Sequence, residues 1–290
     1  MAGVRTRIKL AGLSLMGRSP FCGLGDSIRE YERHVGMESK GREISQSCCL
    51  AESGADGLNR WSTPEGDIWA PESTDRDGLA LILAELKAGA YASGQAAMHS
   101  GDVVLDCGAN IGLFSRSAIA GGASQVVAVE PFSASAECVR RNLAPEIAAG
   151  RVVVYQRGLW DEEGRLPFII DPHNAGGNSF ITMNKDSYKS NELPVTTIDG
   201  IVKELGLAKV DFIKMDIEAA EQRALAGAAV TLQSFHPRMA IAVEHTPDRL
   251  ANAKGVIRVV QQANPSYRFE CGLCYVSSEN QVLPEILYFY

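Results

Sequence analysis

Two carboxylates and two glycines are spaced as in a nucleoside-binding site. An apolar run at residues 103–105 ends in Asp106, and Gly108 and Gly112 follow before a helical pattern begins. A short apolar run, a glycine turn and then a helix indicate a first strand that turns tightly at a ligand site. A second apolar run ends in Glu130, at the position where such sites hold a ribose. The pattern predicts a Rossmann-like opening.

The spacing and charge of this turn favour one nucleoside ligand. A dinucleotide site uses G-x-G-x-x-G so that backbone N–H groups face a pyrophosphate, but Gly108, Asn110 and Leu113 occupy these positions here. Asp106 would repel a pyrophosphate and would suit a ligand that carries ammonium and sulfonium groups. S-adenosyl-L-methionine has both groups and no phosphate, so we expect it as the cofactor. The same reasons disfavour a nicotinamide-dependent oxidoreductase.

The segment D-C-G-A-N-I-G-L-F-S, residues 106–115, resembles motif I of the class I methyltransferases in the form found in the FkbM family. A second segment, residues 210–228, is similar to that family's D-x-I-K-x-D-x-E-G-x-E and L-x-G-A motifs, and residues 193–199 also fit. The resemblance covers about residues 102–244 and extends toward the chain end. Ala219 stands where the family usually has glycine, so the turn there is expected to differ in shape.

The resemblance implies an α/β fold of class I methyltransferase type. Its Rossmann-like sheet is seven-stranded and mostly parallel, with helices on both faces and an antiparallel C-terminal strand. The chain pattern agrees, because apolar runs alternate with helical patterns as βαβ units require. In open α/β sheets, ligands lie beyond the carboxyl ends of the strands.

The expected cofactor contacts therefore follow the strand ends. They are Asp106, Gly108, Ala109, Asn110, Gly112, Glu130, Pro131, Gly158, Leu159, Trp160 and Asp216. Simpler roles stay open: Asp106 could cap a helix, Asp216 could begin one, and Trp160 could belong to a hairpin core.

The residues that would act on an acceptor lie at the same edge. In-line methyl transfer needs an aligned acceptor oxygen, and a neutral hydroxyl must lose its proton to a nearby base. The expected catalytic residues are His245, Asp216 and Glu244, and the sequence leaves open which of them is the base. The expected acceptor contacts are Tyr91, His173, Asn178 and Glu218.

Two further features concern the acceptor side. Residues 171–178, D-P-H-N-A-G-G-N, interrupt the alternation after the third strand and predict a movable acceptor lid; a plain solvated loop is the alternative. Asp216, Glu218 and Glu244 could also bind a hard cation through oxygen. Because acids beside a cationic cofactor have another explanation, we expect no metal.

Composition limits the partners. The chain has 290 residues and a formal net charge of −7, which argues against a nucleic-acid partner. No apolar run approaches the roughly 18 residues of a membrane span, so we expect no membrane partner. Seven cysteines, an odd number, argue against a disulfide framework and favour a reduced, cytoplasmic location. The C-x-x-C spacing of Cys271 and Cys274 indicates packed thiols rather than zinc ligands.

The chain divides into three predicted parts. Residues 1–60 lack sustained periodicity, so we expect them to be poorly ordered or ordered by a partner. Residues 61–100 are expected to form a helical extension, and residues 101–290 the S-adenosylmethionine-dependent methyltransferase domain. A homodimer is compatible with this organisation.

The function that these features predict is S-adenosylmethionine-dependent O-methylation of a small molecule. The acceptor class, a hydroxyl of a sugar or of a natural-product scaffold, is implied by the resemblance. Carboxyl or nitrogen methylation of a small molecule or peptide is an alternative, and a noncatalytic nucleoside-binding module is a third possibility.

Overall fold

Apolar runs along the chain form the strands of one central sheet. The computed structural model describes residues 4–92, 94–171, 175–181 and 188–290. The sheet has the order β12-β13-β11-β10-β4-β5-β6, in which β13 runs antiparallel to both neighbours. Its strands are β4 (Val103–Cys107), β5 (Gln125–Val129), β6 (Val152–Tyr155), β10 (Phe212–Met215), β11 (Arg238–Ala242), β12 (Phe269–Val276) and β13 (Val282–Phe289). This confirms the predicted class I sheet.

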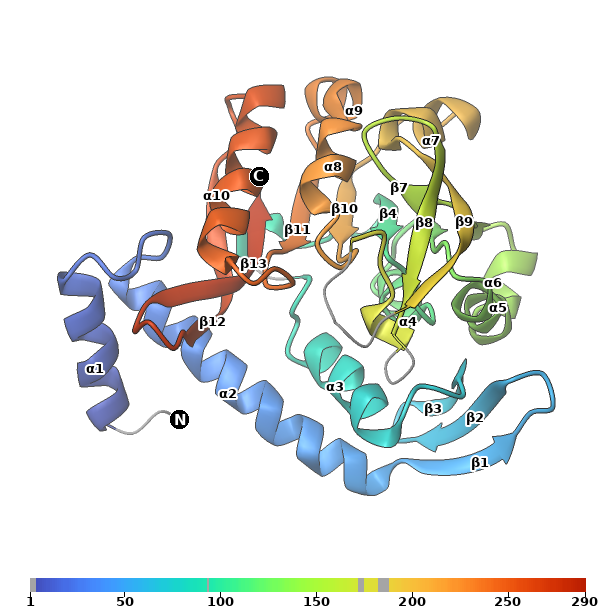
Figure 1. Ribbon diagram of the computed structural model, residues 1–290, viewed down its shortest axis with the longest axis horizontal. Coiled ribbons are helices and arrows are strands. Elements are labelled where there is room, and N and C mark those ends of the chain that lie inside the picture. Colours follow the sequence, from blue (N-terminus) through green and yellow to red (C-terminus); the bar gives the residue numbers. More distant parts are fainter. Residues whose placement is uncertain (1–3, 93, 172–174, 182–187) are drawn as a thin grey trace.

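Helices cover both faces of this sheet, as predicted (Figure 1). Successive strand residues point to opposite faces, so Val104 and Phe212 join one core while Leu105 and Ile213 join the other. The first core includes α3 (Arg76–Lys87), α4 (Leu113–Ala120), α5 (Ser133–Asn142) and α6 (Ala144–Ala148). The second includes α7 (Ile198–Glu204), α8 (Glu221–Ala226), α9 (Ala229–Ser234) and α10 (Arg249–Ala263).

The N-terminal part forms two helices and a small sheet. Residues 1–60, expected to be poorly ordered or ordered by a partner, contain α1 (Val4–Leu15), α2 (Leu24–Ser47) and β1 (Cys49–Ser53). The antiparallel strands β2 (Leu58–Thr63) and β3 (Gly66–Pro71) follow. Helix α2 packs along α3 and β12 (Figure 1). Its buried residues recur at helical spacing, but Ser27, Glu30, Gly41 and Ser45 are among them, so the sequence shows no sustained apolar period.

Residues 61–100, expected as a helical extension, contain strands as well as helices. Strands β2 and β3 occupy the beginning of this range, and Trp61 and Ile68 are buried there. Helix α3 follows, where Asp75 caps the first turn by accepting a hydrogen bond of 2.7 Å from the Gly78 backbone N–H. A short 3-10 helix, η1 (Gly94–Ala96), leads into the central sheet.

A disulfide corrects the expectation of unpaired thiols. Cys22 is bonded to Cys271, at a sequence separation of 249 residues, and the Cys274 sulfur lies 3.4 Å from that of Cys22. The bond attaches the segment before α2 to β12. Counting cysteines could not reveal this pair, because the partner of Cys271 lies at the other end of the chain.

The segment after β6 forms a further small sheet. It contains β7 (Gly158–Leu159), β8 (Gly164–Ile170) and β9 (Tyr188–Thr196), with a 3-10 turn η2 (Ala175–Gly177) between β8 and β9. His173, expected at the acceptor, lies outside the described residues. No described helix combines the length and the apolar composition that crossing a bilayer requires.

Candidate functional site

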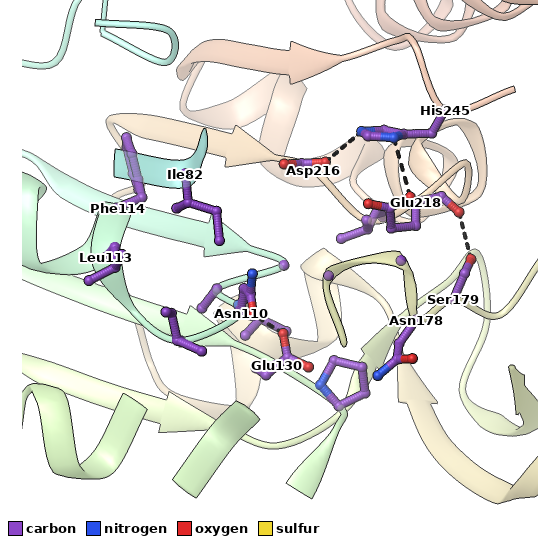
Figure 2. Close-up of a pocket in the computed structure, with 18 of the residues that line it drawn as sticks. Ile82, Asn110, Leu113, Phe114, Glu130, Asn178, Ser179, Asp216, Glu218 and His245 are labelled. Atoms are coloured by element: carbon purple, nitrogen blue, oxygen red, sulfur yellow. Dashed lines mark hydrogen bonds and ion pairs between the residues drawn. The ribbon is translucent and has the colours of Figure 1, made fainter. Parts of the chain in front are cut away.

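A cavity of about 660 Å³ opens beyond the carboxyl ends of β4, β5, β10 and β11. Helix α3 lines one side with Leu81, Ile82 and Glu85, and residues 176–180 line another. Figure 2 shows Asn110 and Glu130 in one part of the cavity, and Asp216, Glu218 and His245 in a second part. The strand ends therefore converge as the fold predicts.

The turn after β4 is built on a glycine that no other residue could replace. Gly108 has φ +78°, and a Cβ atom there would lie 1.9 Å from the Asp216 carbonyl oxygen. The turn continues through Asn110, whose backbone N–H donates to Glu130 Oε2 at 2.9 Å. The Phe132 N–H donates to Glu130 Oε1 at the same distance. Glu130 is thus held by backbone groups at the cavity wall.

The position of Glu130 determines its protonation. Burial raises the pKa of Glu130 to about 7, although the backbone N–H groups of Phe132 and Asn110 lower it. The carboxylate retains free acceptor capacity, since each oxygen can accept more than one hydrogen bond. Ribose hydroxyls are donors of the kind that it could bind.

Asp106 is fully buried below the turn, where Oδ2 accepts a hydrogen bond of 2.6 Å from Ser115 Oγ and Oδ1 lies 3.5 Å from Lys214 Nζ. Asp106 is not among the described residues that line the cavity. In the free protein Asp106 thus contacts Ser115 and its cross-strand neighbour Lys214, and its contact with a charged cofactor group stays a prediction.

Four residues form a connected polar chain at the other end of the cavity. The Tyr91 hydroxyl donates to Asp216 Oδ2 at 2.8 Å, and Asp216 Oδ1 lies 2.8 Å from His245 Nε2. His245 Nδ1 lies 3.2 Å from Glu218 Oε2 (Figure 2). Both imidazole nitrogens therefore face a carboxylate, an arrangement that suits a protonated ring.

In this polar chain, the opposite charges of His245 and Asp216 each stabilise the ionised form of the other residue. Burial by itself lowers the pKa of His245, but the carboxylates of Asp216 and Glu218 raise it to about 11. Burial likewise opposes ionisation of Asp216, yet the charges of His245 and Lys214 hold the pKa of Asp216 below its ordinary range. At neutral pH the free site thus contains an imidazolium beside an ionised Asp216.

Three acids nearby have raised pKa values, although the charge of His245 or Lys214 acts on each of them. Burial is the largest cause that raises the pKa of Glu85, Glu218 and Glu244 to about 8, and neighbouring carboxylates add to it. Glu85 and Glu244 both line the cavity. This part of the cavity therefore favours protons or other positive groups.

A metal alternative was expected to use Asp216, Glu218 and Glu244. The ligand atoms that lie within 4.8 Å of one another belong instead to Asp216, Glu218 and His245. His245 directs both nitrogens at these carboxylates, so binding a cation would require the ring to lose its proton. In the free protein these three residues form an ion-paired group.

Most of the expected site residues lie at the cavity. Its lining contains Tyr91, Gly108, Ala109, Asn110, Glu130, Pro131, Gly158, Leu159, Asn178, Asp216, Glu218, Glu244 and His245. Besides Asp106, two of the expected residues that the structure describes are absent from this lining. Gly112, with φ +83°, packs on Val139 and Leu143, and Trp160 lies instead beside Arg223, whose guanidinium is 5.5 Å from the ring centre.

Several lining residues were not predicted from the sequence. Lys214 is part of the second motif, but a lysine within a buried strand gives no indication of which residues it contacts. Glu85 lies on α3, and Ser179 anchors the segment after η2 by donating from Oγ to the Glu218 carbonyl oxygen at 2.5 Å. Their positions depend on packing between segments far apart in the chain.

The fold and this cavity define a Rossmann-like α/β domain of class I methyltransferase topology. The sequence model of one protein family, the methyltransferase FkbM domain, matches residues 106–269. The chain belongs to this family.

Relatives from fungi and bacteria are similar over part of the chain. Methyltransferase sdnD from Sordaria araneosa is 27% identical over 159 residues, which cover 45% of this chain and 61% of the relative. The 31-O-demethyl-FK506 methyltransferase FkbM from Streptomyces tacrolimicus is 28% identical, with 45% and 60% covered. The chain thus spans about three fifths of the length of these relatives. A crystal structure of methyltransferase FkbM from Methylobacillus flagellatus KT is similar with 18% identity and a TM-score of 0.48, covering 92% of this chain and 60% of that one.

Proposed function

We propose that this protein is an S-adenosylmethionine-dependent O-methyltransferase that acts on a hydroxyl of a small molecule. One observation carries the proposal. The same cavity contains Glu130, a carboxylate that could accept hydrogen bonds from ribose hydroxyls, and the ion pair of Asp216 with His245, which can bind a proton. Family membership supports methyl transfer.

The cofactor end fits a nucleoside without phosphate groups better than a dinucleotide. Asn110 and Leu113 replace two of the glycines that a dinucleotide turn uses, and Glu130 offers a carboxylate for ribose hydroxyls. Gly108 to Ile111, Pro131, Gly158 and Leu159 would surround the nucleoside. When bound, S-adenosylmethionine supplies an electrophilic methyl group on a sulfonium.

The acceptor end explains how a hydroxyl proton could be removed. Asp216 is ionised and oriented by the Tyr91 hydroxyl and by His245. A proton leaving the acceptor oxygen can be taken up by the Asp216–His245 pair, once the imidazolium has released its own proton to solvent. A cation bound nearby repels the imidazolium and favours this release.

An oxygen acceptor agrees with the name of the Streptomyces relative, 31-O-demethyl-FK506 methyltransferase. By analogy, we propose a sugar or natural-product hydroxyl as the acceptor class. Residues 176–180 would form part of an acceptor lid. A cytoplasmic location and a homodimer remain predictions.

An amine is the second candidate acceptor. Glu85, Glu218 and Glu244 give this end of the cavity an acidic lining, which would attract an ammonium group. The same acids would repel a carboxylate, so the carboxyl alternative is the weaker one.

A binding measurement separates these functions. Calorimetry with S-adenosylhomocysteine should show binding, and NAD should not compete. Incubation with S-adenosylmethionine and cell extracts, followed by mass spectrometry, should find a product that has gained one methyl group. Binding of NAD in place of S-adenosylhomocysteine would exclude the proposed cofactor, and binding without any methylated product would indicate a noncatalytic module.

A further inference from the structure

Lys214 is a charged residue within the buried strand β10. It is 5% exposed, and its cross-strand neighbour on β4 is Asp106. Burying an ammonium group and a carboxylate is costly, and a hydrophobic pair of similar volume would often be at least as stable. Strand formation therefore does not explain why a lysine occupies this position.

The contacts of the ammonium group extend to both ends of the cavity. Lys214 Nζ donates to the Gly108 carbonyl oxygen at 2.6 Å and lies 5.3 Å from the centre of the Tyr91 ring. Gly108 belongs to the turn at the cofactor end. Tyr91 donates its hydroxyl hydrogen to Asp216 at the acceptor end. One side chain thus connects two parts of the site that are far apart in sequence.

The surroundings of Lys214 are acidic on several sides. The groups that interact with its charge are Asp106 and Cys107 on β4, Glu130 after β5, Glu85 on α3 and Asp216 after β10. Asp106 is also held by Ser115. A role limited to neutralising Asp106 leaves the short contact with the Gly108 carbonyl unexplained.

We infer that Lys214 is a positioning residue for both ends of the site: its ammonium group fixes the Gly108 turn and holds the Tyr91 ring, whose hydroxyl orients Asp216. This role rests on the proposed function, because the two ends are taken to be the cofactor end and the acceptor end. It differs from a counter-ion role, in which Lys214 and Asp106 would merely neutralise each other.

A neutral pair separates the two roles. The test compares wild type, Asp106→Asn, and Asp106→Asn combined with Lys214→Met, which leaves no uncompensated buried charge from this pair. Lys209→Met is the matched control, since this exposed lysine lies just before β10 and outside the cavity lining. Three quantities are measured: amide hydrogen exchange of residues 107–112 in the free protein, the NMR signal of a ¹³C-labelled Tyr91 ζ carbon, and the Kd for S-adenosylhomocysteine.

The positioning role predicts that the double variant loses protection in the turn, shifts the Tyr91 signal and binds S-adenosylhomocysteine about tenfold more weakly. Lys209→Met should stay close to wild type in all three, and Asp106→Asn alone, which keeps the Lys214 ammonium group, should keep the wild-type Tyr91 signal and the protection of the turn. Wild-type exchange and an unshifted Tyr91 signal in the double variant would overturn the inference. If this variant does not fold, Asp106→Asn combined with Lys214→Gln is measured in its place. A shifted Tyr91 signal in that variant supports the positioning role, and an unshifted signal overturns it. If wild type binds no S-adenosylhomocysteine, the proposed function fails, while exchange and NMR still decide the role of Lys214.

Discussion

Asp216 Oδ1 lies 2.8 Å from His245 Nε2 although the two residues follow different strands, β10 and β11. These strands are adjacent and parallel, so their carboxyl ends bring the two side chains together. Asp216 and His245 are therefore parts of one ion-paired unit and need not be competing candidates for the base.

Replacing His245 by alanine should reduce turnover by roughly 100-fold or more, because no imidazole remains to take up the proton of the acceptor hydroxyl. The pKa of His245 is raised to about 11, so the neutral imidazole becomes more abundant as pH rises above 7. In wild type, kcat/KM should increase toward alkaline pH, and His245→Ala should lose this increase. The measurement is formation of S-adenosylhomocysteine with an acceptor found by the extract screen.

His236→Ala is the matched control, since His236 stacks on Tyr267 away from the cavity. Its turnover should equal that of wild type. Normal turnover in His245→Ala would exclude His245 as the base, and activity restored by added magnesium alone would favour a metal route.

The sequence could predict the strand ends but not the contacts between them. Asp216, Glu244 and His245 were expected at the cavity because each follows a buried apolar run. The pairing of Asp216 with His245 and the hydrogen bond from Tyr91 depend on the side-chain directions after folding. The contacts of Asp106 could not be predicted for the same reason: its neighbour on β10, Lys214, cannot be identified from the local pattern.

Replacing Glu130 by alanine should weaken binding of S-adenosylhomocysteine by about 1.5 to 3 kcal/mol for each lost charged hydrogen bond, roughly 10- to 150-fold in Kd. Because burial raises the pKa of Glu130 to about 7, and ribose hydroxyls bind the carboxylate form, wild-type affinity should improve from pH 6 to pH 8. Calorimetry at several pH values measures both effects.

A ligand analogue without ribose hydroxyls provides the control for Glu130. Wild type and Glu130→Ala should bind it with similar affinity. Equal loss of affinity for both ligands would mean that Glu130 acts by shaping the Asn110 turn and not by contacting the ribose.

Glu85→Gln should raise the melting temperature at pH 8 and leave it unchanged near pH 4. Burial raises the pKa of Glu85 from 4.5 to about 8, so the folded state binds its proton more tightly than the unfolded chain. The free energy of unfolding contributed by this group is complete below pH 4.5 and is lost as pH rises through 8. Thermal unfolding over this range tests the prediction, with exposed Glu162→Gln as control. A constant difference at every pH would contradict it.

The central sheet was predictable because its strands are short apolar runs with turn residues at their ends. The N-terminal helices were not, since α2 is ordered by contacts with α3 and β12 rather than by its own periodicity. The same applies to the Cys22–Cys271 bond. In each case the information lies in a distant segment that local patterns do not include.

Ala219→Gly should stabilise the protein by about 0.5 to 1 kcal/mol, the relief of left-handed strain less the added entropy of an unfolded glycine. Ala219 has φ +78°, at the position where the family usually has glycine. Ala220, with φ −88°, is the matched site, and Ala220→Gly should lower stability. Denaturant unfolding measures both variants. Equal destabilisation of the two would show that the Ala219 backbone is not strained.

The segment from η2 to Phe180 should behave as a lid for the acceptor. Ser179 anchors it by backbone hydrogen bonds with Ile169 and by its contact with the Glu218 carbonyl, while Gly176, Gly177 and Asn178 line the cavity. Deleting residues 175–177 should impair acceptor use and leave the Kd for S-adenosylhomocysteine nearly unchanged, because the cofactor end lies on the turn after β4. Deleting residues 162–163, in the turn after β7, should affect neither property. Hydrogen exchange of residues 175–181 should slow when S-adenosylhomocysteine and acceptor are both present, and unchanged exchange together with normal activity of the shortened protein would reject the lid.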